Sequence, residues 1–96
     1  MKKRYLITYD LNKAGKNYDN VISSIKKASD GRWCTYWKSS YLIRSNYQTA
    51  AQVMSLISPY LDGDDSLIVI EVINNKQCWT IPKRFEYINE SIFTDN

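Results

Sequence analysis

The sequence contains no histidine and only two cysteines. The absence of histidine excludes the commonest general base, the commonest zinc ligand and any nucleophile that a histidine activates. Cys34 and Cys78 lie far apart and form no C-x-x-C pair, so we expect free thiols in preference to a disulfide. Any chemistry must therefore come from carboxylates, lysines or tyrosines.

Long hydrophobic runs are also missing. The longest unbroken apolar run is Leu67 to Ile70, which is far too short to cross a bilayer. The basic start at residues 1–4 resembles that of a secretion signal, but residues 5–10 are too short and too polar to continue one. We therefore expect a cytoplasmic protein with no export and no membrane anchor. The net charge of +3 permits a polyanionic partner such as nucleic acid without requiring one.

Periodic patterns of apolar residues predict one domain over residues 1–96, with a core at about 4–73 and a C-terminal extension at 74–96. Apolar residues recur at helical spacing over 18–28, and Thr49 is a suitable N-cap for a second helix. The six elements expected in the core are strands at 4–11, 32–37, 40–44 and 66–73 and helices at 18–28 and 49–61.

The order strand, helix, strand, strand, helix, strand predicts an α+β fold of the ferredoxin-like βαββαβ type. We expect a four-stranded antiparallel sheet with both helices on one face. Residues 78–81 carry a weaker strand signal, which predicts an extra C-terminal strand, and an amphipathic segment follows from Phe85 to Phe93.

The fourth predicted strand lacks the alternation expected of a sheet with one face in water. Leu67, Ile68, Val69 and Ile70 are all apolar, and bulky aromatic residues also share one face of the second predicted strand. These features predict a homodimer in which a second copy covers the open face. The alternative is that the C-terminal tail of the same chain folds over the sheet.

Asp10 is the strongest candidate for a functional residue. It ends the first predicted strand, where a carboxylate has no packing role, and the loop with Asp62, Asp64 and Asp65 should approach it. Carboxylates of this kind suit Mg²⁺, so we take Asp10, Asp64 and Asp65 as candidate metal ligands. The alternative is that Asp10 caps its loop and the other three form a solvated turn.

The basic residues that follow Asp10 are candidates for binding phosphate. Lys13 and Lys16 flank Gly15 in a polar loop, and Arg44 on the third predicted strand is a further candidate contact to nucleic acid. Aromatic residues could also stack on bases, but the third strand lacks the pattern of RNA-binding sheets. Packing in the core or an interface is therefore the favoured use of Trp33, Tyr36, Trp37 and Tyr41.

Two segments resemble the small CRISPR-associated Cas-two proteins. These are Tyr5-Leu6-Ile7-Thr8-Tyr9-Asp10-Leu11 and Asp64-Asp65-Ser66-Leu67-Ile68-Val69-Ile70. The loop at residues 12–19 and the hairpin at 33–43 are more similar to the SinR-like branch of that superfamily, which is related to the VapD-type toxins. The resemblance covers roughly residues 4–73.

The resemblance implies a ferredoxin-like dimer whose C-terminal strand can pair across the two subunits. Nuclease-active relatives use the aspartate that matches Asp10, one from each subunit, around a Mg²⁺ ion that activates water. Other relatives hold DNA without cleaving it, and VapD-type relatives are ribonucleases. These nucleases have a dense Arg/Lys cluster after the aspartate, where this chain has only Lys13 and Lys16.

Three functions remain open from the sequence. The first is a Mg²⁺-dependent endonuclease, acting on RNA more readily than on DNA, with Asp10 as its catalytic residue. The second is a non-catalytic dimeric module that binds nucleic acid or a protein partner, of the kind that a phage or mobile element encodes. The third is a sensor of a small ligand.

Overall fold

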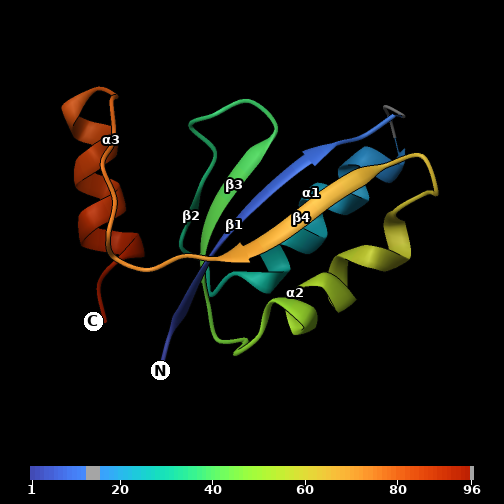
Figure 1. Cartoon of the computed structure of the whole chain (residues 1–96), viewed down its shortest axis with the longest axis horizontal. Helices are drawn as coiled ribbons and strands as arrows, with labels where there is room; N and C mark the ends of the chain where they lie inside the picture. The colour runs from blue at the N-terminus through green and yellow to red at the C-terminus, as the bar shows by residue number, and fades with distance from the viewer. Residues whose placement is uncertain (13–15, 96) are drawn as a thin grey trace.

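The fold is built around strand β1, which lies inside an antiparallel sheet (Figure 1). The computed structural model describes residues 1–12 and 16–95. In chain order the elements are β1 (Lys3–Asp10), α1 (Lys16–Ala28), β2 (Trp33–Cys34), β3 (Ser40–Ser45), α2 (Ala50–Ile57), the 3₁₀ turn η1 (Ser58–Tyr60), β4 (Ser66–Glu71), α3 (Pro82–Tyr87) and the π-helical turn η2 (Ile88–Ile92).

The four strands lie in the order β2-β3-β1-β4, and all neighbouring pairs are antiparallel. Tyr5 of β1 lies opposite Ile43 of β3 on one side and Glu71 of β4 on the other. The predicted α+β fold with a four-stranded antiparallel sheet is therefore confirmed. The arrangement is compatible with a ferredoxin-like fold.

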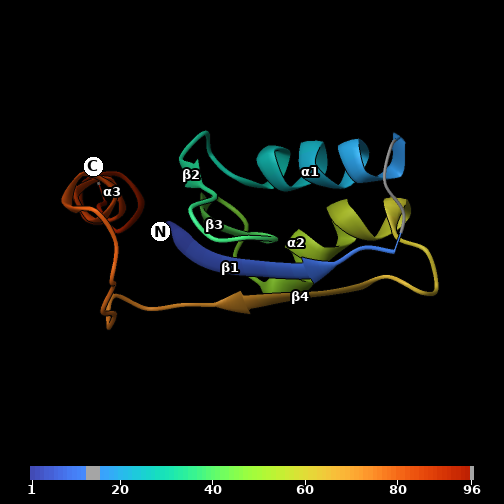
Figure 2. The ribbon, with the colours of Figure 1, turned by 90° about the horizontal axis from the view of Figure 1, so that it is seen from above.

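Helices α1 and α2 lie together on one side of the sheet (Figure 2). Alternate residues of β1, namely Tyr5, Ile7 and Tyr9, are buried on this side, as period-two alternation predicts. They pack with residues at helical spacing on α1 and with Val53 and Ile57 of α2. Burial of this set is the main source of the fold's stability.

Helix α2 begins where the sequence predicts. The Thr49 side chain accepts a hydrogen bond from the Gln52 amide, and the Gln52 side chain accepts from the Thr49 amide in return. The α-helix ends at Ile57, earlier than predicted, because Pro59 lies in the 3₁₀ turn that follows. The C-terminal boundary of the predicted helix is therefore wrong by one turn.

The opposite face of the sheet is covered over only one half. Cys34 of β2 and Leu42 of β3 pack with Ile88 and Ile92 of η2. The tail thus folds over the β2–β3 half of this face, which is the arrangement that the sequence left as the alternative to a dimer. On the β1–β4 half, Thr8, Asp10, Ile68 and Ile70 stay exposed, and we call this part of the sheet the open face.

The extra C-terminal strand predicted at residues 78–81 is wrong for the single chain. The chain leaves β1 after Val72, whose amide still bonds to the Arg4 carbonyl, and no strand occurs beyond β4 in residues 72–95. Pro82 then starts α3 directly, with Ile81 as its N-cap. Strand β2 is also shorter than predicted, at two residues.

Two further expectations have an outcome in the structure. Both cysteines are free, with Cys34 buried and Cys78 partly buried, as predicted. None of the helices in residues 1–12 and 16–95 has the length and apolar character needed to span a membrane.

Candidate functional site

Asp10 lies at the end of β1 with its side chain on the open face. The alternation that buries Tyr9 on the helix side leaves Asp10 exposed on the other. Its backbone pairs with Ser66, the first residue of β4, and the two border a groove of about 350 Å³ that also includes Thr8 and Ile68. Among residues 1–12 and 16–95, no hydrogen-bond or ion-pair partner contacts the Asp10 carboxylate. It is therefore available to a ligand.

The acidic loop binds the chain that follows Asp10. Asp64 Oδ2 accepts a 2.7 Å hydrogen bond from Asn12 Nδ2, and Asp65 Oδ1 accepts one of 2.9 Å from the Asn12 amide. The second oxygen of Asp65 accepts from the Asp62 amide at 2.8 Å. The loop thus approaches the end of β1 as predicted, and these carboxylates hold the two segments together.

A metal site within one chain would need several of these carboxylates to converge. In the described part of the chain, no three His, Cys, Asp or Glu side chains form a group that could hold a metal ion. Asp64 and Asp65 are engaged with Asn12. Mg²⁺ can bind through one or two carboxylates together with water and substrate phosphate, so the carboxylate chemistry of Asp10 suits it. The predicted Mg²⁺ site stays a prediction.

The two lysines predicted to clamp phosphate cannot be assigned a geometry. Lys13 lies outside the described residues. Lys16 is the first residue of α1, and its side chain is also outside the description. Their role stays a prediction.

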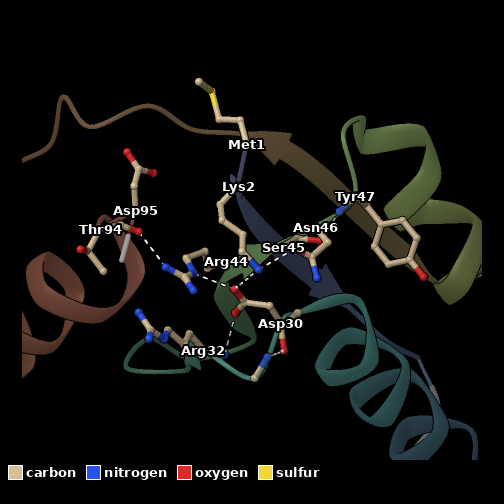
Figure 3. A network of polar contacts seen from close by, with 12 residues as sticks. Met1, Lys2, Asp30, Arg32, Arg44, Ser45, Asn46, Tyr47, Thr94 and Asp95 are labelled. Atoms are coloured by element: carbon tan, nitrogen blue, oxygen red, sulfur yellow. Dashed lines mark hydrogen bonds and ion pairs between the residues drawn. The ribbon is translucent and has the colours of Figure 1, made fainter.

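Arg44 lies in a setting that argues against its predicted contact with nucleic acid. The residue is only 6 % exposed. Its Nε donates to Asp30 Oδ2 at 2.7 Å, and its Nη1 donates to the Thr94 carbonyl at 2.8 Å (Figure 3). A phosphate could reach this guanidinium only by breaking a buried ion pair. Arg44 therefore has a structural role, which the sequence pattern did not reveal.

Asp30 is the centre of this polar network (Figure 3). Its carboxylate pairs with Lys2 Nζ at 2.9 Å and Arg44 Nε at 2.7 Å, and it accepts from the Arg32 amide at 3.1 Å. Burial alone raises the pKa of Asp30, but these hydrogen bonds outweigh it and hold the pKa below its ordinary value. The network joins the N-terminus, the end of α1 and β3.

Arginines from the sheet region also bind the C-terminal end of the tail. Arg4 donates to the carbonyls of Ile92 and Thr94, and Arg32 donates to that of Ser91. The last carbonyls of a helix carry partial negative charge and lack partners within the helix, so these cations satisfy them. Arg4 and Arg32 therefore hold the tail against the sheet.

The aromatic residues divide between core and surface. Tyr41 is buried beside Tyr9 and Trp33, and Lys26 lies over the Trp33 ring at 4.6 Å from its centroid. Burial raises the pKa values of Tyr9 and Tyr41, so both hydroxyls stay protonated and neither supplies a base. Trp37 keeps an exposed ring at the surface.

The open face carries apolar residues that stay exposed in the described part of the chain. Ile68 is 50 % exposed and Ile70 is 44 % exposed, opposite Thr8 and Leu6 of β1. Beyond β4 no further strand pairs with the sheet in the described residues, so the edge of β4 is open as well. Uncovered apolar side chains beside an open strand edge are typical of an interaction surface.

Comparisons with protein-family models, with curated proteins and with solved structures found no match to this chain.

Proposed function

We propose that the chain acts as a homodimer in which the two Asp10 carboxylates meet and, with Mg²⁺, support cleavage of RNA. The proposal extends to a ferredoxin-like fold and to kinship with the Cas-two superfamily, nearest its SinR-like and VapD-related branch. One observation carries it: Asp10 is an exposed carboxylate without a partner in the described chain, on the same face as Ile68 and Ile70.

The free energy of covering that face supports the dimer. Full burial of an isoleucine side chain stabilises by about 1.5–3 kcal/mol, so covering the exposed half of one contributes roughly 1 kcal/mol. Ile68 and Ile70 from two chains then supply about 4 kcal/mol between them. Two sheets that pack face to face lie about 10 Å apart, which brings groups at the sheet surface within reach of one another.

The residues present fit Mg²⁺ as a shared ion. Asp10 from each subunit would hold it, leaving its remaining positions to water and to substrate phosphate. When bound, the ion supplies a water of lowered pKa and neutralises charge on the phosphodiester. Asp64 and Asp65 support the two Asp10 side chains indirectly, because they bind Asn12, two residues beyond Asp10. Lys13 and Lys16 are the residues proposed to contact phosphate.

A second candidate is a non-catalytic dimer that binds nucleic acid or a protein partner. The observation that favours it is the use of Asp64 and Asp65 as loop-fixing groups, so that among the described residues Asp10 is the carboxylate that lines the groove. Arg44 also offers no charge to a polyanion, because its guanidinium is buried against Asp30.

Cleavage of single-stranded RNA and DNA with Mg²⁺ or Mn²⁺ separates the two candidates. We expect the wild type to cleave RNA and Asp10→Asn to lose activity by more than about 100-fold, since a metal ligand is removed at constant shape. Glu90→Gln makes the same chemical change at an exposed position on η2 and should cleave like the wild type. Equal rates in wild type and Asp10→Asn, or no cleavage by either, would remove the nuclease and leave the binding module.

A further inference from the structure

A cavity of about 200 Å³ lies where the open face meets the tail. Its apolar walls come from the sheet side and from the tail, and they include Leu6, Trp37, Leu42, Ile88 and Phe93. The segment that joins β4 to α3 forms another wall, through residues 75–78. The site is thus an apolar pocket at the end of the open face opposite to Asp10.

Trp79 directly follows that wall and is fully exposed. Ile73 and Ile81, on the same connecting segment, are also mostly exposed. A tryptophan with its whole ring in water forgoes the burial that this residue normally obtains. Tryptophan is one of the residues enriched among the hot spots of protein interfaces, where it fills a well-packed pocket.

The pocket and the Trp79 side chain match in size and chemistry. An apolar cavity of about 150 Å³ accommodates benzene. An indole is larger than benzene by a fused five-membered ring, which suits the 200 Å³ of this pocket. The aromatic walls Trp37 and Phe93 favour an aromatic occupant, and the side-chain amide oxygens of Asn75 and Gln77 can accept the indole N–H.

We propose that Trp79 of each subunit inserts into this pocket of the other subunit. The inference rests on the proposed homodimer and identifies the residue that anchors it. The occupant is a second copy because Trp79 and the pocket wall belong to one short segment. Two copies related by a two-fold axis beside that segment therefore exchange their tryptophans reciprocally.

The same axis is compatible with paired Asp10 side chains. The connecting segment begins at Val72, which bonds to Arg4 near the start of β1, whereas Asp10 ends that strand. A two-fold axis that runs parallel to β1 between the two sheets places the same end of β1 from each subunit at the same end of the dimer. The Asp10 groups then lie at one end of the interface and the exchanged tryptophans at the other.

Trp79 and the pocket that receives it supply about half of the area of a standard interface. A buried tryptophan removes about 150–250 Å² from water. A standard interface buries about 800 Å² on each partner, so Trp79 alone supplies roughly a quarter of this area. The walls of the receiving pocket supply a similar share, and Ile68 and Ile70 continue the same surface.

Sedimentation of Trp79→Ala tests the exchange. Because the Trp79 side chain is fully exposed among the residues that the structure describes, its removal should leave the fold intact. We expect the Kd of the dimer to rise at least 100-fold, since each dimer loses two anchors and one anchor is worth about 30-fold. Trp79→Phe should recover most of the affinity. The control Tyr60→Ala removes an exposed aromatic residue of η1 and should leave the Kd unchanged.

Indole added to the wild type supplies an independent readout. Indole should occupy the pocket and dissociate the wild-type dimer. In Trp79→Ala it should bind to the pocket without changing the oligomeric state. A dimer of unchanged Kd in Trp79→Ala would overturn the exchange while leaving the homodimer standing. A wild type that stays monomeric would overturn both. Protection of Trp79 by single-stranded RNA without dimerisation would also overturn the exchange, since the occupant would then be a base.

Discussion

Among single changes of charged residues, replacing Asp30 by alanine should lower the free energy of unfolding the most. The Asp30 side chain is 5 % exposed and pairs with the guanidinium of Arg44, itself buried. Breaking a buried pair by removing one partner typically costs about 3–5 kcal/mol, because the other charge stays behind without compensation. A domain of this size has a total stability of about 5–15 kcal/mol. The variant should therefore lose a large share of its stability, and it would be close to unfolding at room temperature if the total lies at the lower end of this range.

Urea unfolding followed by circular dichroism measures this loss as a fall in the free energy of unfolding. The control Glu90→Ala removes an exposed carboxylate and should change that free energy by less than about 0.5 kcal/mol. A second change, Arg44→Met, should restore part of the stability of Asp30→Ala, because it removes the uncompensated charge. A loss below about 1 kcal/mol in Asp30→Ala would refute the reasoning, since the pair would then behave as a surface salt bridge.

Four further outcomes are expected. The pKa of Asp30 is depressed below its ordinary value of 3.8, so its contribution to the free energy of unfolding is complete above that pH and is lost as the pH falls. This pH dependence should disappear in Asp30→Asn. If it persists in that variant, another group causes it. Thr49→Ala should lower that free energy by about 1 kcal/mol through loss of the capping box, measured with urea, and an unchanged midpoint would contradict the cap. Gly31→Ala should cost about 1–2 kcal/mol because Gly31 has a φ of 100°, and calorimetry showing no loss would contradict that strain. Burial, together with the neighbouring Cys78, raises the pKa of the Cys34 thiol to about 11. A thiol reagent at pH 8 should therefore label Cys78 first, and faster labelling of Cys34 would contradict its burial.

The elements that follow from local patterns could be predicted from the sequence. Strand β1 alternates so regularly that both its buried side and the exposure of Asp10 follow from the pattern. Helix α2 has its start fixed by Thr49, a residue three positions from its partner Gln52. Short-range interactions of this kind depend on the neighbouring sequence alone.

The parts that the sequence did not predict depend on distant partners. Arg44 reads as an accessible cation at the end of a strand, but its partners Asp30 and Thr94 are 14 and 50 residues away. The tail has β-like residues at 78–81, but β4 is joined to β1 on one edge and the tail departs from the sheet before it can pair. In the candidate site the sequence predicts that the acidic loop approaches Asp10. It does not predict the bonds of Asp64 and Asp65 to Asn12, because these segments are more than fifty residues apart.

The central claim is that a second copy of the chain covers the open face and brings the two Asp10 groups together. Light scattering coupled to size-exclusion chromatography tests it most directly. We predict a species with twice the 11.3 kDa mass of one chain for the wild type, and a single chain for the variant Ile68→Asp/Ile70→Asp. A wild type that elutes as one chain at every concentration would contradict the account.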